Sequence, residues 1–324
     1  MDSYPQHQFT TKRSFTYNYY ITPPQPGKEW ILFLHGFPSA PFHFRHQIKY
    51  LSEKRYGILA PDLLGYGESS QPADVKAYTG TGMTEDLIEI LDHEKIEHVL
   101  GVGHDWGSFL LSRLANYYPS RIKKCVFLDV GYLPPGHAMT KEAATIINTM
   151  MKKQIGYCCF GYPLFFDEDG ADKVMDDNID SVIPLFFTQD EEIVKEYMGE
   201  EGGTRKWLEG KMTTELPSFF TPEDQEHFHK YFSTGFLGPV NWYRAQIHDV
   251  NHEDEKDIPE LSKEIEQPVL IICARNIISM AADFAGHMER FCDDMEVKKT
   301  TAGHWIMLEN IDETNETLEE FFEK

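Results

Sequence analysis

The stretch GVGHDWGS, residues 101–108, decides the fold prediction because it joins an apolar run to a helical one. Gly103 and Gly107 flank Asp105 with the spacing of a sharp strand-to-helix turn that presents a nucleophile. Such turns more often carry serine at the central position. A carboxylate at this position therefore indicates a reaction different from that of a serine nucleophile.

Short apolar runs and helical segments alternate on both sides of this turn. Buried strands are expected at 29–36, 56–67, 97–105, 125–131 and 267–274. Helices are expected at 84–94, 106–118, near 281–291 and over 312–324. This alternation predicts an α/β fold with a mostly parallel central sheet and helices on both faces.

The alternation is interrupted in the middle of the chain. Residues 133–262 are rich in helical stretches, aromatic residues and acidic loops, and they contain no buried-strand pattern. We therefore expect a core domain made of 1–132 and 263–324, with 133–262 inserted as a helical cap, or lid, over the sheet.

The chain is strongly acidic, with 53 Asp and Glu against 30 Lys and Arg and a formal charge of −23. This charge disfavours nucleic acids and anionic membrane surfaces as partners. No apolar run approaches membrane-spanning length, and the five cysteines form no CxxC pair. We expect a cytoplasmic monomer or homodimer that binds no nucleic acid, membrane, metal or cofactor.

Polar residues follow several of the expected strands. They are the segment 35–38, Asp105, Asp129 and, after the last strand, His304. Ligands of open α/β sheets bind beyond the carboxyl ends of the strands, so these residues are expected to meet there. Their chain order, with a nucleophile, then an acid, then a histidine, is that of a known catalytic triad arrangement.

Four motifs together resemble the α/β-hydrolase superfamily in its epoxide hydrolase branch. They are HGFP (35–38), APDLLGYGES (60–69), GHDWG (103–107) and GHW (303–305), and they span both halves of the core. The resemblance implies an α/β-hydrolase fold with a helical cap. It also implies that Asp105 is a nucleophile and that His304 is a general base.

A carboxylate nucleophile is suited to attack at a saturated carbon. Attack of Asp105 on an epoxide or alkyl halide gives an alkyl-enzyme ester, and water activated by His304 can then cleave it. The backbone N–H groups of Phe37 and Trp106 are expected to stabilise the oxyanion. The alternative is that Asp105 only caps the following helix, but HGFP and GHW favour catalysis.

Two tyrosines of the insertion are candidates to protonate the opening ring, since phenols stay protonated at neutral pH. GPVNWYRA (238–245) resembles a cap element of epoxide hydrolases and assigns this role to Tyr243. FGYPLFF (160–166) resembles the other cap element and points to Tyr162, with Tyr157 as its competitor. Packing of an aromatic ring with a solvated hydroxyl is the alternative for each.

The third member of the triad departs from the family pattern. Epoxide hydrolases usually carry A-x-x-D after the strand that here reads PVLIICA, but Ile277 stands at the position of that Asp. We favour Asp129, at the end of the neighbouring strand. Asn276 or Asp283, a turn-forming role for Asp129, and a broken triad with slow ester hydrolysis remain open.

Aromatic residues around the turn are expected to line an apolar pocket. They are Phe37, Trp106 and Trp305, next to Pro38, while His35 supports the HGFP turn and His104 packs behind the site.

The sequence thus predicts hydrolysis of a small hydrophobic epoxide to a vicinal diol. One alternative is a haloalkane or haloacid dehalogenase that uses the same nucleophile. The other is a non-catalytic ligand-binding homologue that has kept the pocket.

Overall fold

The computed structural model describes residues 1, 4–136 and 138–324, and the chain folds as two compact units. The first unit comprises Met1–Ser70, Thr79–His137 and Glu253–Lys324, and the second comprises Gln71–Tyr78 and Ala138–His252. The long segment of the second unit lies inside the 133–262 expected for the insertion. The segment 71–78, expected in the core, belongs to the second unit.

Eight strands of the first unit form one sheet in the order β1-β2-β4-β3-β5-β6-β7-β8. They are β1 (Gln6–Thr10), β2 (Thr16–Thr22), β3 (Trp30–Leu34), β4 (Gly57–Pro61), β5 (Val99–His104), β6 (Ile122–Leu128), β7 (Val269–Cys273) and β8 (Met295–Lys299). β4 and β5 are buried at every residue, as their continuous apolar runs predict. From β4 to β8 all neighbours are parallel, which confirms the predicted α/β fold.

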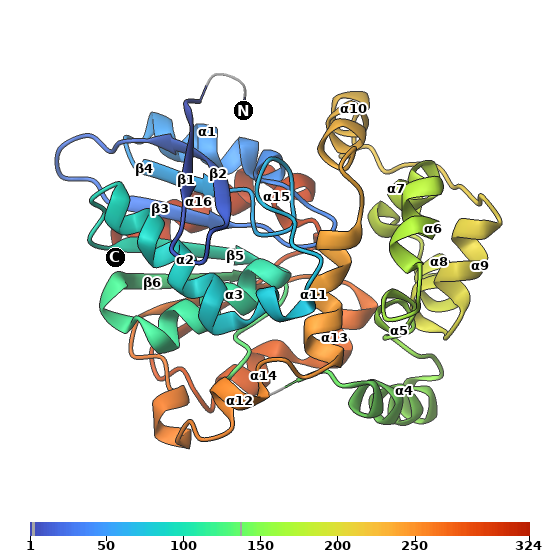
Figure 1. Cartoon of the computed structure of the whole chain (residues 1–324). Helices are drawn as coiled ribbons and strands as arrows, with labels where there is room; N and C mark the ends of the chain where they lie inside the picture. The colour runs from blue at the N-terminus through green and yellow to red at the C-terminus, as the bar shows by residue number, and fades with distance from the viewer. Residues whose placement is uncertain (2–3, 137) are drawn as a thin grey trace. The chain divides into compact units, whose positions relative to one another are not determined.

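Helices cover both faces of this sheet, as expected. In Figure 1, α2 and α3 lie on the near face, and α1 and α16 lie behind it. The helices of the first unit are α1 (Arg45–Glu53), α2 (Gly80–His93), α3 (Trp106–Tyr117), α13 (Ile277–Ala282), α14 (Phe284–Met288), α15 (Ile306–Glu309) and α16 (Ile311–Glu323). The 3₁₀ turns η1 (Pro41–Phe44), η3 (Pro119–Arg121) and η5 (Glu260–Lys263) connect them.

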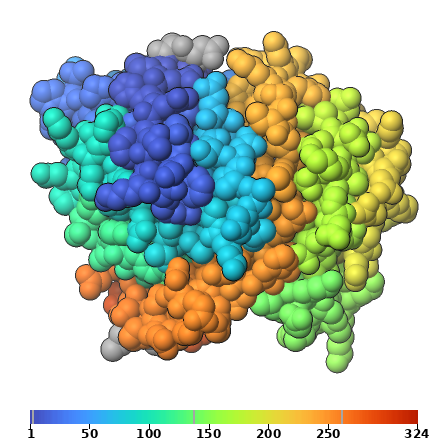
Figure 2. Space-filling model, viewed as in Figure 1, coloured from blue at the N-terminus to red at the C-terminus, as the bar shows by residue number. Residues whose placement is uncertain are grey.

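The N-terminal hairpin of β1 and β2 is not anticipated from the sequence. Its strands pair antiparallel with each other, and β2 pairs antiparallel with β4. β2 buries two tyrosines besides Ile21, and the hydroxyl of Tyr17 donates to Asp86 of α2 at 2.9 Å. Because tyrosine carries a polar hydroxyl, these buried rings do not make the strand stand out as an apolar run in the sequence. Figure 2 shows this N-terminal region, in dark blue, at the surface of the unit.

Two helix predictions need correction. α2 begins at Gly80 rather than at Thr84, because the side chain of Thr79 accepts the N–H of Gly82 and caps the helix there. The single helix expected near 281–291 is two short helices, α13 and α14. Asp283 separates them in a left-handed conformation with φ +44°, which ends α13 after one and a half turns.

The second unit contains helices and no strand among its described residues. They are η2 (Val75–Tyr78), α4 (Lys141–Ile155), α5 (Tyr162–Phe166), α6 (Ala171–Asp177), α7 (Ile179–Phe187), α8 (Glu191–Ile193), a π-helix η4 (Val194–Gly199), α9 (Gly203–Glu209), α10 (Pro222–Tyr231) and α11 (Leu237–Ile247), with α12 (His252–Glu255) at the boundary. Buried aromatic and aliphatic residues form its core, for example Phe165, Trp207 and Trp242.

A buried ion pair joins the two segments of the first unit that border the insertion. Arg113 of α3 is fully buried, and its Nε and Nη2 donate to the carboxylate of Glu255 at 2.5 and 3.0 Å. The same carboxylate accepts the N–H of Gly136 at 2.6 Å and the hydroxyl of Tyr117 at 3.1 Å. Arg113 also donates to the carbonyl of Leu133 at 2.5 Å. α3 therefore holds together the segment that precedes the insertion and the segment that follows it.

Replacing Glu255 by Gln should leave the guanidinium of Arg113 buried without a counter-charge. Because uncompensated buried charge is costly, we expect the free energy of unfolding to fall by about 3 kcal/mol. The urea midpoint of unfolding measures this loss. Glu253→Gln, at an exposed position of the same helix, is the matched control and should change stability by less than about 0.5 kcal/mol. Equal midpoints for the two variants would contradict the structural role of the pair.

Candidate functional site

Asp105 occupies the turn between β5 and α3. β5 lies between β3 and β6 in the sheet, and α3 begins at the next residue, Trp106. The backbone of Asp105 adopts φ 53° and ψ −122°, a conformation that is costly for a residue with a side chain. The surrounding strands fix this strained turn, which presents the carboxylate at the carboxyl end of the sheet.

Two glycines permit the close packing around this turn. A Cβ atom on Gly107 would lie 1.9 Å from the carbonyl oxygen of Leu34, so α3 starts directly against the end of β3. A Cβ atom on Gly36 would lie 2.4 Å from Oδ1 of Asp105. The backbone of the HGFP turn therefore passes directly beside the carboxylate, where no larger residue can be placed.

The carboxylate of Asp105 accepts backbone hydrogen bonds. The N–H of Phe37 donates to Oδ1 at 2.7 Å, and the N–H of Trp106 contributes a second hydrogen bond. The Asp105 side chain does not cap α3 by a hydrogen bond, so helix capping does not account for the residue. Two backbone donors converge on one carboxylate, which is the arrangement that an oxyanion requires.

The environment of Asp105 acts on its pKa in opposing directions. Burial raises the pKa of the carboxyl, because a low-dielectric environment disfavours the charged form. The charge of His304 and the N–H groups of Phe37 and Trp106 act in the opposite direction, but burial prevails and the pKa remains raised. His304 and the N–H groups of Phe37 and Trp106 therefore reduce the free-energy cost of a negative charge on Asp105.

His304 lies in the loop between β8 and α15 and contacts Asp129. Its Nδ1 is 2.5 Å from Oδ2 of Asp129, which follows β6 and is 2% exposed. With Nδ1 donating to the carboxylate, the proton of a neutral imidazole is on Nδ1 and Nε2 is the basic atom. This pairing joins the carboxyl end of β6 to the loop after β8.

The pKa of His304 is raised from its ordinary value. Burial disfavours the charged imidazole, but the hydrogen bond and charge of Asp129 outweigh it, and the charges of Asp105 and Glu309 add to the increase. A stronger base results, and its charged form is stabilised by carboxylates on separate elements of the first unit.

The other candidate acids occupy different environments. Asn276 donates through Nδ2 to both oxygens of Asp129, at 3.2 and 3.3 Å. Asp283 is exposed at the end of α13, and Ile277 is the first residue of that helix. Among these candidates, Asp129 is the one whose carboxylate contacts His304.

The loop that carries His304 is held by two further residues. The carboxylate of Glu309 accepts the N–H of Gly303 at 2.7 Å and the N–H of Trp305 at 3.0 Å, on either side of the histidine. Nε2 of His104 donates to the carbonyl of His304 at 2.8 Å. The sequence reading missed Glu309, whose only signal was its place in the first helical turn after GHW.

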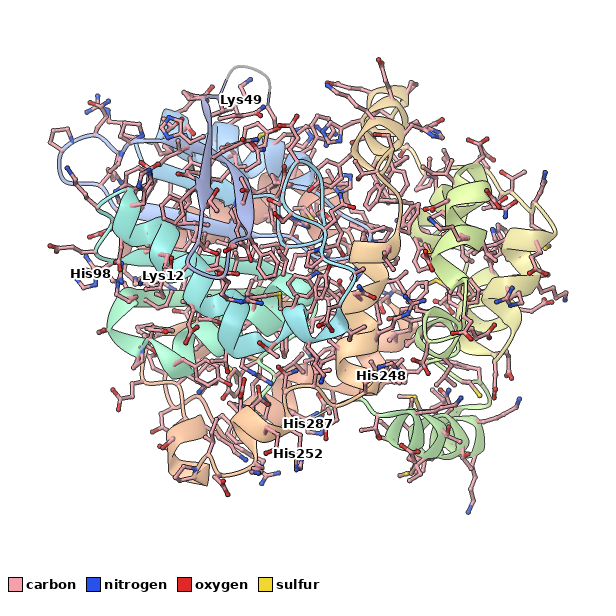
Figure 3. The ribbon with its side chains drawn as sticks, viewed as in Figure 1. Lys12, Lys49, His98, His248, His252 and His287 are labelled. Carbon is pink, nitrogen blue, oxygen red and sulfur yellow. The ribbon has the colours of Figure 1, made fainter. Side chains whose placement is uncertain are left out.

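The remaining residues predicted around the turn are buried. His35 is fully buried and contacts the carbonyl of Gly36 and the N–H of Leu63, and burial lowers its pKa to about 3. The aromatic side chains and proline of the predicted pocket are also buried; these are Phe37, Pro38, Trp106 and Trp305. By contrast, the histidines labelled in Figure 3, namely His98, His248, His252 and His287, have exposed side chains.

Tyr162 and Tyr243 lie together in the second unit. Tyr162 begins α5, Tyr243 lies on α11, and their ring centroids are 5.7 Å apart in an edge-to-face arrangement. Tyr243 is 3% exposed and packs against Phe166 at 4.7 Å between ring centroids. The alternative phenol, Tyr157, packs its ring under the ammonium group of Lys195 at 5.3 Å.

Two polar residues near Tyr243 in the GPVNWYRA motif, Asn241 and Arg244, bind α11 to neighbouring segments of the second unit. Nδ2 of Asn241 donates to the carbonyls of Pro72 and Ala73, at 3.4 and 3.3 Å, which ties the segment 71–78 to α11. Nε of Arg244 donates to the carbonyl of Phe166 at 2.9 Å and ties α11 to the end of α5. The motif therefore fixes α11 against the helix that carries Tyr162.

Within the described ranges 1, 4–136 and 138–324, no cluster of three or more His, Cys, Asp or Glu could hold a metal ion. No helix in the same ranges combines the length and the apolar composition needed to cross a membrane.

Comparison with known proteins gives consistent relatives. A family model described as alpha/beta hydrolase fold matches residues 29–151. The chain is 30% identical over 316 residues to epoxide hydrolase A of Mycobacterium tuberculosis, which covers 92% of this chain and 91% of that protein. It is 27% identical over 296 residues to bifunctional epoxide hydrolase 2 of Sus scrofa, covering 89% of this chain. The chain spans about half the length of that relative and of its mouse and rat counterparts.

A solved structure resembles the whole chain. The crystal structure of epoxide hydrolase A from Mycobacterium thermoresistibile superimposes with a TM-score of 0.80 at 26% identity, and 98% of each chain is covered. The fold, the strand-to-helix turn and these relatives agree with the resemblance drawn from the four sequence motifs. The chain belongs to the α/β-hydrolase family, as an epoxide hydrolase-like member.

Proposed function

We propose that this protein hydrolyses small hydrophobic epoxides to vicinal diols through an ester at Asp105. The observation that carries the proposal is the carboxylate of Asp105, whose Oδ1 accepts the N–H of Phe37 at 2.7 Å within the unit that also holds the His304–Asp129 pair. The relatives named epoxide hydrolases support the choice of substrate class. The side chains of Phe37 and Trp106, which adjoin the carboxylate, and of Trp305, which contacts His304, are buried and suit an apolar substrate.

In the first step, the carboxylate oxygen without the Phe37 hydrogen bond is the nucleophile. Oδ2 of Asp105 forms a bond to one ring carbon, and the bond between that carbon and the ring oxygen breaks. The released alkoxide takes a proton from a phenol of the second unit. Tyr162 and Tyr243 are assigned this role, because their rings lie side by side and α11 is fixed to α5. The inserted unit thus acts as the cap.

In the second step, His304 removes a proton from water, and the water oxygen attacks Cγ of the ester. Negative charge develops on Oδ1, which already accepts the N–H of Phe37, and the N–H of Trp106 is the second donor to this carboxylate. Collapse of this intermediate breaks the bond between Cγ and Oδ2. The second proton of the water moves from its oxygen to the departing Oδ2, so the diol is released and Asp105 returns as a carboxylate. The proton held by His304 replaces the one lost by the tyrosine, so epoxide and water are consumed and the enzyme is restored.

Replacing His304 by Gln should separate the two steps. Alkylation of Asp105 can still proceed, while hydrolysis of the ester loses its base, so a covalent adduct is expected to accumulate. Intact-protein mass spectrometry after incubation with a reactive aryl epoxide should show a mass increase equal to the epoxide, located on Asp105 by peptide mapping. The Asp105→Asn/His304→Gln double variant is the control and should stay unmodified. A wild-type enzyme that releases halide but forms no diol would instead indicate a dehalogenase.

The rate of ester hydrolysis should depend on the neutral form of His304. Because its pKa is raised, the acid limb of the single-turnover hydrolysis rate is expected above pH ~6.5, the ordinary value for histidine. Asp129→Asn removes the carboxylate that favours the imidazolium, so the limb should move to lower pH while the plateau rate falls. An acid limb that does not move in Asp129→Asn would exclude this residue as the partner of His304.

Replacing the two tyrosines by Phe tests the cap. Tyr243→Phe and Tyr162→Phe should each slow the alkylation step, by roughly 100-fold for the double variant, because the alkoxide loses its proton donors. Stopped-flow quenching of tryptophan fluorescence can follow this step. Tyr157→Phe is the matched control, since its ring packs against Lys195, and its alkylation rate should equal that of the wild type. A double variant with wild-type alkylation would assign proton donation to another group.

A further inference from the structure

We propose that Asn276 is a positioning residue, whose side-chain amide holds the carboxylate of Asp129 in register with His304. The inference rests on the proposed function, because it concerns the acid that supports the general base. Asn276 stands one residue before Ile277, where the family pattern has its aspartate. The side-chain amide of Asn276 donates a hydrogen bond to the carboxylate of Asp129, which follows β6.

The orientation of the Asn276 amide is fixed by the helix that it caps. Its Oδ1 accepts the N–H of Ile278 at 3.1 Å and the N–H of Ser279 at 2.8 Å, which makes Asn276 the N-cap of α13. A flipped amide would place its N–H₂ against these two donors. Nδ2 must therefore face the other way, toward Asp129 and the hydroxyl of Ser279 at 2.8 Å.

The carboxylate of Asp129 needs this donor because it is buried. Asp129 is 2% exposed, its backbone is held at φ +67°, and His304 donates to Oδ2 alone. Among the described hydrogen bonds, the one from Asn276 is the one that reaches Oδ1, at 3.2 Å. A buried carboxylate oxygen without a donor is costly. Asn276 removes that cost and fixes the rotation of the carboxylate.

The charges around the Asp129–His304 pair explain why the N-cap residue of α13 carries an amide and not a carboxylate. Asp105, in the turn after β5, and Glu309, on α15, act on His304, and the ring of His104, the last residue of β5, lies beside it. Cys273, at the end of β7, lies close enough to Asp129 for the carboxylate to raise its pKa, after the larger effect of burial. An aspartate at position 276 would cap α13 equally well, but it would place a second negative charge against Asp129. Asparagine provides the cap and a donor together.

Asn276→Ser tests the role, because serine is also a favoured N-cap but lacks the N–H₂ group. Without that donor, Asp129 becomes a stronger acceptor for the His304 proton, so the pKa of His304 should rise. We expect the midpoint of the His304 titration, followed by NMR of labelled imidazole and assigned with His304→Gln, to rise by about half a pH unit. The single-turnover rate of ester hydrolysis at pH 6 should fall about threefold in parallel.

Two further variants separate positioning from helix capping. Asn276→Asp keeps the shape and the cap, and its added charge should raise the His304 midpoint more than Asn276→Ser does. Ser279→Ala removes the other acceptor of the Asn276 amide and should leave the midpoint where it is in the wild type. Thermal unfolding identifies variants that fail to fold. Unchanged midpoints in both folded Asn276 variants would overturn the inference, since a purely structural cap affects stability alone.

The NMR measurement is independent of turnover, so the two proposals can fail separately. A wild type that forms diol, with variants whose midpoints do not move, overturns the role of Asn276 and leaves the proposed function standing. A wild type that forms no diol, with a midpoint that rises in Asn276→Ser, overturns the proposed function and supports the coupling of Asn276 to His304 through Asp129.

Discussion

The strained backbone of Asp105 is the constraint on which the rest of the site depends. Its left-handed conformation allows β5 to pass directly into α3 while the carboxylate stays at the edge of the sheet. The packing of Gly107 against Leu34 and of Gly36 against Asp105 holds the turn in place. The same contacts aim the N–H of Phe37 at the carboxylate. One backbone arrangement thus sets both the geometry and the electrostatic environment of the Asp105 carboxylate.

The carboxylates at the carboxyl end of the sheet each accept hydrogen bonds from donors on a different element. Asp105 accepts hydrogen bonds from backbone N–H groups, and Asp129 accepts them from His304 and Asn276. Glu309 accepts hydrogen bonds from the N–H groups of the residues on either side of His304. Because each carboxylate has its own donors, several negative groups can lie near one imidazole without a collective loss of stability. Such preorganisation is what a reaction that moves charge between Asp105 and His304 requires.

The sequence predicted the strands β3 to β7 because they are continuous apolar runs, and the Asp105 turn because its glycines have a fixed spacing. The hairpin of β1 and β2 was missed, since two of the buried residues of β2 are tyrosines, whose hydroxyls donate to Asp86 and Glu94. Asp129 could be suggested from its place after a strand, but its contact with His304 depends on a loop nearly two hundred residues away in the chain. The donor role of Asn276 depends on an amide orientation, which no pattern of residues reveals.

Arg113 donates to the carbonyl of Leu133 and to the carboxylate of Glu255, which in turn accepts the N–H of Gly136, so the two ends of the inserted segment are held together. The backbone N–H of Gly136 and a carboxylate oxygen of Glu255 are 2.6 Å apart, so the chain leaves and returns at nearly the same point. A linker of a few residues could therefore join the two ends if 138–252 were excised, and the segment 71–78 would lose the hydrogen bonds from Asn241. Insertions and deletions within 138–252 can therefore be accommodated without separating the two segments of the first unit that flank it.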